Sequence, residues 1–378
     1  MNERYHTYLP WFLLKEIPLL GNTTIKKLIQ RFHSPENIFT ASDDDLLTIG
    51  DITPKTVANI KNHHRYRRSA KEELEKILQN GFRIIAFTEA AYPALLKKIP
   101  DPPPVLTYLG SLDNIQPCIS VVGSRNATTY GLSTARHLSA RLASKGFQIV
   151  SGLARGIDTA AHQGALDQNG KTIAVLGAGL NRIYPKENRR LFDTIAASGA
   201  VLSEFKTDAQ PLREHFPVRN RIIAGLSCGT VVVEAAKRSG SLITARLATE
   251  YNREVFAVPG SIKSKKSEGT HALLKNGACL VESEMDIVDE LYQFIHSSHG
   301  TGNHEMSEKD NPLTLEKSVE NDYPLLKLMD AYPVHIDLLI EKSNLNSASV
   351  TAQLLDLELM QKVVRHPGNY YSISEGMH

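Results

Sequence analysis

Residues 216–235 read FPVRNRIIAGLSCGTVVVEA, and this stretch joins a helix-like segment directly to a strand-like one. The apolar run Val231–Val233 is typical of a strand that is buried on both faces, as in a parallel sheet. Ile222, Ile223 and Leu226 are spaced to pack one face of a helix on that sheet. The stretch therefore predicts a helix–strand unit of an α/β fold. It leaves one polar group to be explained, namely Arg219, Asn220 and Arg221.

The same pattern repeats along the chain from residue 118 to residue 283. The strand-like runs are CISVVGS (118–124), FQIVSG (147–152), KTIAVLGAG (171–179), AVLSEF (200–205), GTVVVEA (229–235), EVFAVPG (254–260) and ACLVES (278–283). The helices that we expect between them are 129–146, 157–169, 186–198, about 210–226, 241–252 and 270–276. Two further strands are predicted in 82–90 and 104–111. This alternation indicates right-handed βαβ units in a doubly wound parallel sheet of an α/β fold, which we assign to residues 82–296.

A helical domain is predicted to precede the sheet, over residues 1–81. The segments 13–32 and 46–63 are similar, because each has an apolar approach, a glycine turn and then Thr or Pro opening a helix. Such a helix–hairpin–helix can present backbone N–H groups to a phosphate, although a small helical bundle with ordinary caps explains the pattern equally well. Residues 52–70 contain no acidic residue and several basic ones. This composition is typical of a surface that binds nucleic acid or of a helix face exposed to solvent.

The C-terminal part is predicted to be a flexible linker followed by a winged helix. Residues 297–321 are polar and aperiodic, whereas 322–378 show three helices and a hairpin with a Pro-Gly-Asn turn. The expected recognition helix, 347–361, contains no basic residue, and residues 323–373 carry four basic and five acidic side chains, a net charge of −1. A DNA reader is normally basic, so we expect this domain to contact protein, or duplex DNA only weakly.

Composition excludes several classes of protein. The chain has 378 residues with a net charge of only +2, so any nucleic-acid site must come from local clustering of charge. Its three cysteines form no C-x-x-C pair, which argues against a zinc site or a disulfide framework and suits a reducing compartment. Lys15, Glu16 and Pro18 interrupt the N-terminal apolar run, and no later run reaches the length of a membrane span. We therefore expect a cytoplasmic protein with no membrane segment and no metal.

Small and basic residues follow the strands of the predicted sheet. Ligands of open α/β sheets bind at the carboxyl ends of the strands, where glycine lets a backbone approach closely and helix N-termini attract anions. The segments that meet there are Gly123-Ser124-Arg125, Ser151-Gly152, Ala154-Arg155, Gly177-Ala178-Gly179 with Lys186, Ser239-Gly240-Ser241 and Pro259-Gly260-Ser261. Together they predict a phosphate-binding edge. Neither the dinucleotide G-x-G-x-x-G pattern nor a Walker A motif is present, so NAD and ATP are not favoured and no cofactor is expected.

Two groups of residues leave catalysis open. Asp158 lies four residues before His162 on a predicted helix, and this pair can be a proton-transfer pair or a capping aspartate beside a packed histidine. Glu204 and Glu234 are expected to end neighbouring strands, where they can converge as catalytic carboxylates or be buried beside Arg219 or Arg221.

Seven motifs of the α/β region, in order, resemble the DNA-processing protein A family, DprA, also called Smf. They are GSRNATTYG (123–131), SGLARGIDTAAHQGAL (151–166), GKTIAVLGAGLNRIYPKENRRL (170–191), SEF (203–205), FPVRNRIIAGLSCGTVVVEA (216–235), SGSLITARLATE (239–250) and VFAVPGS (255–261). The chain departs from the family at Ser267-Glu268-Gly269-Thr270-His271, where His271 stands in place of an asparagine.

The resemblance implies a recombination mediator of natural transformation rather than an enzyme. It implies that residues 82–296 form an extended Rossmann-like parallel sheet domain that binds single-stranded DNA and forms homodimers. It also implies protection of incoming strands and loading of RecA. Part of the dimer or RecA surface is expected in 269–296. Together with the pattern of small and basic residues, it assigns DNA contacts to Gly123, Ser124, Arg125, Gly152, Arg155, Lys186, Arg219, Asn220 and Arg221. Phe216 and Tyr184 adjoin these residues and are candidate stacking platforms for bases, with a place in the apolar core as the alternative for both.

Two other functions stay open from the sequence. Gly229-Thr230 followed by Glu234 is similar to the P-G-G-x-G-T-x-x-E loop of phosphoribohydrolases, although Ser227-Cys228 replaces its paired glycines. A transcription regulator led by the winged helix is the other alternative, and the acidic recognition helix argues against it.

Overall fold

The computed structural model describes residues 2–113, 115–297, 324–329, 334–343, 345–360, 362–366 and 368–373. The chain divides into two compact units, Met1–Thr301 and Gly302–His378. The predicted linker, apart from its first residue, lies outside the described residues. In the described part, no helix has the length and apolar character needed to span a membrane.

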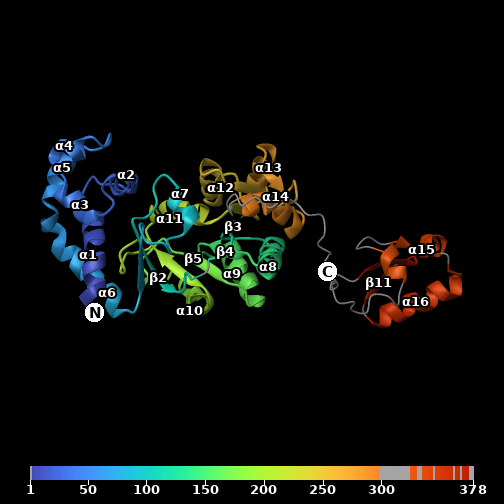
Figure 1. Cartoon of the computed structure of the whole chain (residues 1–378). Coiled ribbons are helices and arrows are strands. Elements are labelled where there is room, and N and C mark those ends of the chain that lie inside the picture. Colours follow the sequence, from blue (N-terminus) through green and yellow to red (C-terminus); the bar gives the residue numbers. More distant parts are fainter. Residues whose placement is uncertain are drawn as a thin grey trace, which may run out of the picture. The chain divides into compact units, whose positions relative to one another are not determined.

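The first unit begins with a cluster of short helices, which confirms the predicted helical region (Figure 1). Its elements are α1 (Asn2–Glu16), α2 (Asn22–Phe32), α3 (Pro35–Thr40), α4 (Asp43–Leu47), α5 (Pro54–Lys61), the 3-10 helix η1 (His63–Tyr66) and α6 (Arg67–Gln79). The side chains of Ser34, Ser42 and Thr53 cap α3, α4 and α5 by accepting a backbone N–H of the first turn. The cluster packs on the sheet region through a shared apolar core and through Glu73, whose carboxylate accepts the Thr207 N–H at 2.6 Å.

A nine-stranded sheet forms the centre of this unit, in the order β1-β2-β6-β5-β4-β3-β7-β8-β9. The strands are β1 (Arg83–Ala86), β2 (Val105–Gly110), β3 (Cys118–Val122), β4 (Gln148–Ser151), β5 (Thr172–Val175), β6 (Ala200–Ser203), β7 (Gly229–Val232), β8 (Glu254–Ala257) and β9 (Cys279–Leu280). All pairs from β6 to β9 are parallel, whereas β2 runs antiparallel to both β6 and β1. The predicted parallel α/β sheet is confirmed, with an antiparallel extension at the β6 edge.

The strand order reverses at β3. The chain builds β4, β5 and β6 on one side of β3 and then returns to its other side with β7, β8 and β9. The loops after β3 and β7 therefore diverge, which leaves a crevice at the carboxyl ends of these two strands. This is the switch point of the sheet. β6 and β7 are separated by three strands, so the expectation that Glu204 and Glu234 end neighbouring strands is wrong.

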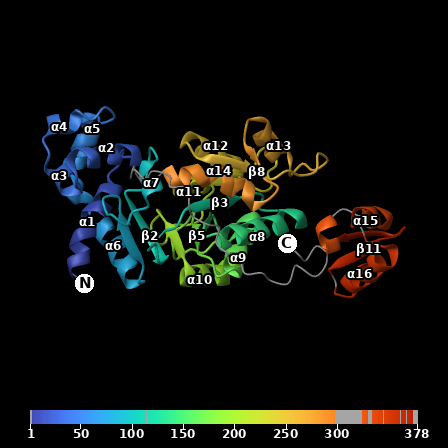
Figure 2. The same cartoon turned by 45° about the vertical axis from the view of Figure 1, so that its right-hand side comes forward.

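Helices cover both faces of the sheet (Figures 1 and 2). They are α7 (Ala94–Lys98), α8 (Thr129–Ser144), α9 (Ile157–Asp167), the 3-10 helix η2 (Lys186–Asn188), α10 (Arg189–Ser198), α11 (His215–Leu226), α12 (Ser241–Glu250), α13 (Glu268–Lys275) and α14 (Glu284–Ser297). The six predicted segments are confirmed as helices, whereas α7 and α14 were not predicted. Helices α11 and α12 pack with Val122, Val150 and Val232 on one face. Helices α8, α9 and α14 pack with the alternate residues, such as Val121 and Val231, on the other. Successive strand residues are thus buried on both faces.

The second unit has the winged-helix arrangement. Its described elements are the 3-10 helix η3 (Pro324–Leu328), β10 (Val334–His335), α15 (Ile336–Ser343), α16 (Ser347–Leu359), β11 (Val363–His366) and β12 (Tyr370–Ile373), with sheet order β10-β12-β11. The predicted start of a helix at Ser347 is confirmed, and the Asn346 side chain caps it. Where the sequence predicts a first α-helix, the described residues form only a 3-10 turn.

Candidate nucleic-acid site at the carboxyl edge of the sheet

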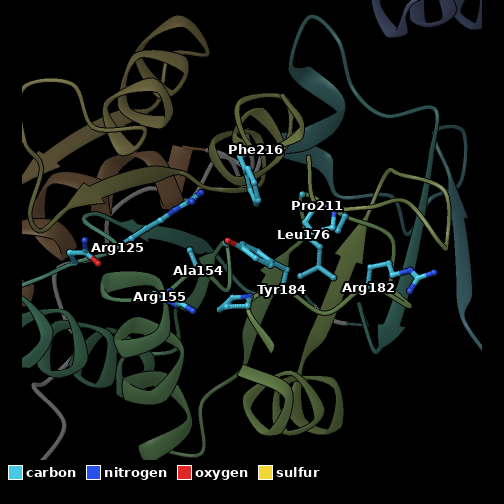
Figure 3. A pocket seen from close by; sticks show the side chains of 13 residues that line it. Arg125, Ala154, Arg155, Leu176, Arg182, Tyr184, Pro211 and Phe216 are labelled. Atoms are coloured by element: carbon cyan, nitrogen blue, oxygen red, sulfur yellow. The ribbon is translucent and has the colours of Figure 1, made fainter. Parts of the chain in front are cut away.

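Two adjoining pockets lie at the carboxyl edge of the sheet, and both are lined by Arg125, Ala154 and Phe216. The aromatic pocket adjoins the ends of β4 and β5, and the switch-point pocket adjoins the ends of β3 and β7. The aromatic pocket is lined by Arg125, Asn126, Gly152, Ala154, Arg155, Leu176, Gly177, Ala178, Arg182, Tyr184, Pro185, Pro211 and Phe216 (Figure 3). The other residues of the switch-point pocket are Val122, Gly123, Ser124, Asp158, Pro217, Arg219, Asn220, Ile223, Ala236, Ser239, Gly240, Ser241, Ile243 and Thr244.

Aromatic rings and an arginine meet in the aromatic pocket (Figure 3). The Tyr184 and Phe216 rings lie 5.9 Å apart between centroids and are inclined by 45°. The Arg125 guanidinium lies over the Phe216 ring, 4.8 Å from its centroid. Phe216 can approach the end of β5 because Gly177 has no side chain, since an added Cβ would come within 2.8 Å of the ring. The pocket thus presents an aromatic surface with a cation beside it.

Two of the predicted cations lie on the outer side of this pocket. Arg155 forms an exposed ion pair with Glu187. Lys186, at the start of η2, is exposed and lines neither pocket. Their loops are tied together by Asn188, which donates to the Leu153 carbonyl at 2.9 Å and to Thr159 Oγ1 at 2.8 Å. This tie keeps Lys186 at the carboxyl edge, close in sequence to Tyr184.

Arg219 is buried in the wall of the switch-point pocket, with 3% of its surface exposed. Its Nη1 donates to the carbonyls of Gly152 (2.6 Å) and Val175, and its Nε donates to Asn220 Oδ1 at 3.2 Å. Burial lowers the pKa of Arg219 to about 10, so it remains a cation at neutral pH. An added Cβ at Gly152 would overlap the guanidinium, which explains the glycine at this position. Arg219 therefore supports the pocket from within rather than reaching out from it.

The remaining wall of the switch-point pocket consists of loop backbone and small polar side chains. Asn220 Nδ2 donates to the Gly240 carbonyl at 3.4 Å, which links α11 to the start of α12. Ser239, Gly240 and Ser241 line the pocket at the N-terminal end of α12, a ten-residue helix whose dipole favours anions there. Arg125 is the exposed cation of this pocket, whereas the buried Arg219 lies in the wall close to the buried carboxylate of Asp158.

Arg221 lies elsewhere, which corrects the expectation that it faces this edge. Its side chain is buried in an ion pair with Glu204 and in a second one with Asp101, whose Oδ2 is 3.4 Å from Arg221 Nε. Arg221 lines neither pocket. The physical reason is the helix: residues two apart point in directions about 200° apart, so Arg219 and Arg221 cannot face the same surface of α11.

Glu204 and Glu234, the candidate catalytic carboxylates, both have structural roles. Glu234 accepts hydrogen bonds from Thr128 Oγ1 and from the Thr128 backbone N–H, the latter at 2.9 Å, so it fixes the start of α8. Glu204 pairs with Arg221 instead of converging with Glu234. Within the described residues, no group of three or more His, Cys, Asp or Glu side chains is arranged to hold a metal.

Asp158 and His162 do not form a proton-transfer pair. Asp158 accepts the backbone N–H groups of Gly152 (3.1 Å) and Ala154 (3.4 Å). Burial raises the pKa of Asp158, while Arg219 and these hydrogen bonds act against that rise. His162 is fully buried and its Nδ1 lies 2.7 Å from Thr172 Oγ1, and burial lowers its pKa to about 3. The packed histidine of the second alternative describes the structure, whereas Asp158 holds the loop before α9 and does not cap the helix, whose N-cap residue is Gly156.

The sequence interpretation missed Arg182 and Asn126, which line the aromatic pocket. Arg182 is an exposed basic residue in the loop after β5. The search for basic residues after each strand, which pointed to Lys186 in the same loop, would also have found Arg182. His271, which departs from the family pattern, lies with Nε2 3.0 Å from the Gly260 carbonyl and so holds the loop after β8.

Comparisons with known proteins agree with this arrangement. Residues 83–292 match the family described as DNA recombination-mediator protein A, residues 312–369 match the DprA winged helix domain, and residues 12–65 match a SAM-like helix-hairpin-helix tandem. The chain is 36% identical to Protein Smf of Synechocystis over 388 residues, covering 96% of this chain and 97% of that protein. It is 45% identical to DNA processing protein DprA of Streptococcus pneumoniae over 252 residues, 65% of this chain and 88% of the relative.

Two solved structures extend the comparison. The X-ray structure of DprA from Streptococcus pneumoniae aligns with a TM-score of 0.66 at 40% identity, covering 76% of this chain and 97% of that one. A structure of DNA processing protein A from Helicobacter pylori, described by its single-stranded DNA binding mode, aligns with a TM-score of 0.51 at 30% identity. That alignment covers 56% of this chain and 96% of that one.

Proposed function

This chain belongs to the DNA-processing protein A family, also called Smf, and on that premise we propose that it binds single-stranded DNA at the two pockets. Like its relatives, it is a DNA-processing recombination mediator. The observation that carries the proposal is the Arg125–Phe216 contact at the boundary of both pockets. Sequence-neutral binding of single strands combines a positive groove with aromatic platforms for bases, and this edge supplies both.

In this proposal, the aromatic pocket binds a base and the switch-point pocket binds the phosphate backbone. A base fits against Phe216 and Tyr184 in the aromatic pocket, since any base has a π-face that can stack there. The backbone phosphates pass the switch-point pocket, where Arg125, Arg219 and the N-terminal end of α12 attract them. Arg221 is left out of the contact set because its guanidinium is occupied by Glu204 and Asp101.

Other assigned residues act at the margin of this site or behind it. Lys186 and Arg155 are exposed at the outer side and add long-range attraction, and Glu187 partly neutralises Arg155. Gly123 lies against Ile157 and the Glu234 carbonyl, where an added Cβ would collide. It therefore acts by letting the loop that carries Ser124 and Arg125 lie low over the sheet.

Salt-dependent binding tests this proposal. Fluorescence anisotropy of a labelled single strand and of its duplex, over a series of salt concentrations, gives affinity and salt slope. Arg125→Ala is expected to weaken binding to all single-stranded sequences alike and to reduce the slope by about 0.7 for one lost phosphate contact. Arg83→Ala is the matched control, because Arg83 is exposed on β1, the edge strand of the sheet, and four strands separate β1 from β3. An unchanged slope in Arg125→Ala would contradict the site assignment.

We also propose the finer role that the family resemblance implies. In this role the protein acts in the cytoplasm, protects incoming single strands, loads RecA on them during natural transformation, and catalyses no hydrolysis. It works as a homodimer through the sheet domain, with residues 269–296 contributing to the dimer or RecA surface. The functional division is 1–81, 82–296, a linker at 297–321, and 322–378. The acidic α16 makes protein contact the expected role of the last domain.

RecA assembly on DNA already coated with single-strand-binding protein tests the mediator role. Wild-type protein is expected to shorten the lag before RecA hydrolyses ATP, and Arg125→Ala is expected to shorten it less. Sedimentation measures the dimer separately. A lag that wild-type protein leaves unchanged would contradict RecA loading without affecting the DNA-binding proposal.

A further inference from the structure

Beyond the two pockets, a pair of basic loops continues the carboxyl edge of the sheet. We call them the basic loop pair; they are residues 236–240 after β7 and residues 259–267 after β8. Backbone hydrogen bonds hold the loops together, since the Ala235 N–H donates to the Lys266 carbonyl at 2.8 Å and the Gly269 N–H donates to the Ala235 carbonyl at 2.7 Å. The loops therefore form one surface.

The basic loop pair is positively charged and open to solvent. Lys237 and Arg238 are exposed on the first loop, and Lys263 and Lys265 are exposed on the second. No ion pair links these four side chains to any carboxylate in the described ranges, whereas many other exposed arginines and lysines there are paired, as Arg136 is with Asp167. Free exposed cations attract phosphates without first breaking a salt bridge.

A groove with an exposed aromatic ring lies beside these loops. We call it the loop groove; it is lined by Thr128, Tyr130, Glu234, Pro259, Gly260, Ser261, Ser264 and Ser267. Tyr130 is 53% exposed, and its hydroxyl donates to the Pro259 carbonyl at 3.0 Å. This bond fixes one end of the side chain while much of the ring stays accessible. An exposed ring beside free cations is the combination that single-strand binders use.

One segment joins the loop groove to the switch-point pocket. Residues Gly123–Arg125 line the pocket, and Thr128 and Tyr130, a few residues further on, line the groove. Glu234 fixes the middle of this segment through its hydrogen bonds to Thr128. A strand that leaves the switch-point pocket along this segment reaches Tyr130 and the basic loop pair without leaving the positive edge.

We propose that the loop groove and the basic loop pair form a second contact segment for the same DNA strand. The phosphates of this segment lie beside Lys263 and Lys265, and a base packs on Tyr130. The inference rests on the proposed function, because the pockets hold the first segment. The path extends toward β8, away from the Glu187 and Arg155 side. A duplex fits this surface less well, because its bases are stacked on each other and cannot pack on Tyr130.

Oligonucleotide length separates the two segments in an experiment. Binding is measured with single strands of about six and about 16 nucleotides, within the range that one single-strand site covers. Lys263→Gln/Lys265→Gln is expected to weaken binding of the longer strand and to lower its salt slope by about 1.4, or 0.7 for each lost contact. The same variant is expected to bind the shorter strand as wild type does.

The control is Lys145→Gln/Lys171→Gln, which removes two exposed lysines close to the starts of β4 and β5, at the opposite edge. It is expected to leave both lengths unaffected. If the loop variant binds the longer strand like wild type while Arg125→Ala does not, the second segment is wrong and the proposed function stands. Equal losses for both lengths also overturn the second segment. Wild-type protein that binds neither strand overturns the proposed function itself.

Tyr130 gives an independent test of the base contact. Tyr130→Ala is expected to weaken binding of the longer strand only, without changing its salt slope, because no phosphate contact is lost. Tyr130→Phe keeps the ring and is expected to retain most of the affinity. Wild-type affinity of Tyr130→Ala for the longer strand would contradict the contact.

Discussion

The guanidinium of Arg125 lies 4.8 Å from the centre of the Phe216 ring, which joins the loop after β3 to the start of α11. Both residues line both pockets of the proposed site. A cation over an aromatic face is attracted by the ring quadrupole, so the contact holds the arginine close to the surface on which a base would stack. One interaction therefore organises the phosphate and the base contacts together.

Phe216 is expected to contribute to affinity through stacking rather than through charge. Phe216→Leu should weaken single-strand binding by about 1–3 kcal/mol, the usual contribution of one base stacked on an aromatic ring. The salt slope should stay constant, because leucine removes no phosphate contact. Anisotropy titrations at several salt concentrations measure both quantities. Phe216→Tyr retains the ring as a control, and a Phe216→Leu variant that binds like wild type would remove Phe216 from the site.

Arg219 is expected to affect stability and binding together. Arg219→Met leaves the Gly152 and Val175 carbonyls without their donor, and hydrogen bonds to a charged group contribute about 1.5–3 kcal/mol each. We expect a lower free energy of unfolding by urea and weaker DNA binding. Arg125→Ala is the comparison, because Arg125 is exposed and should affect binding alone. Unchanged stability in Arg219→Met would contradict the supporting role of this side chain.

Arg221 is expected to affect stability without affecting phosphate contact. Arg221→Met removes the ion-pair partner of the mostly buried Glu204 carboxylate and leaves it, among the described residues, only the hydrogen bond from Asn22 Nδ2 at 3.4 Å. Breaking a buried ion pair typically costs about 3–5 kcal/mol of folding free energy. Combining it with Glu204→Leu should restore part of that loss, since an apolar pair can replace a buried ion pair. The double variant should bind single strands with the wild-type salt slope. A reduced salt slope would show that Arg221 does contact a DNA phosphate.

The sheet could be predicted from the sequence because its strands are buried on both faces. Runs such as Val231–Val233 then become continuously apolar, and the segments between them keep helical periodicity. The edge with Gly123, Arg125 and Gly152 followed from the same reasoning, because carboxyl ends of parallel strands share one edge.

The features of the site that could not be predicted from the sequence depend on the order of the strands and on the direction in which each helix residue points. Glu204 and Glu234 follow similar strands, but three strands lie between them, and local pattern carries no information on that order. Arg219 and Arg221 look equivalent in FPVRNR, yet the turn of α11 directs one toward Gly152 and the other toward Glu204. The burial of Arg219 likewise results from contacts with β4 and β5, which are distant in the sequence.

His162 is expected to make the stability of the sheet domain depend on pH. Burial holds its pKa at about 3, below the ordinary value of 6.5, so the unfolded chain binds a proton more readily than the folded one. The contribution of the neutral, buried His162 to the free energy of unfolding is fully present above pH 6.5. It is lost as the pH falls toward 3, by about 1.4 kcal/mol per pH unit. His162→Gln has no such proton to bind and should show a shallower decline of the urea-unfolding free energy between pH 6.5 and 4.5. His137→Gln, which replaces an exposed histidine on α8, controls for removal of a histidine. Parallel declines in wild type and His162→Gln would show that His162 is not held neutral by burial.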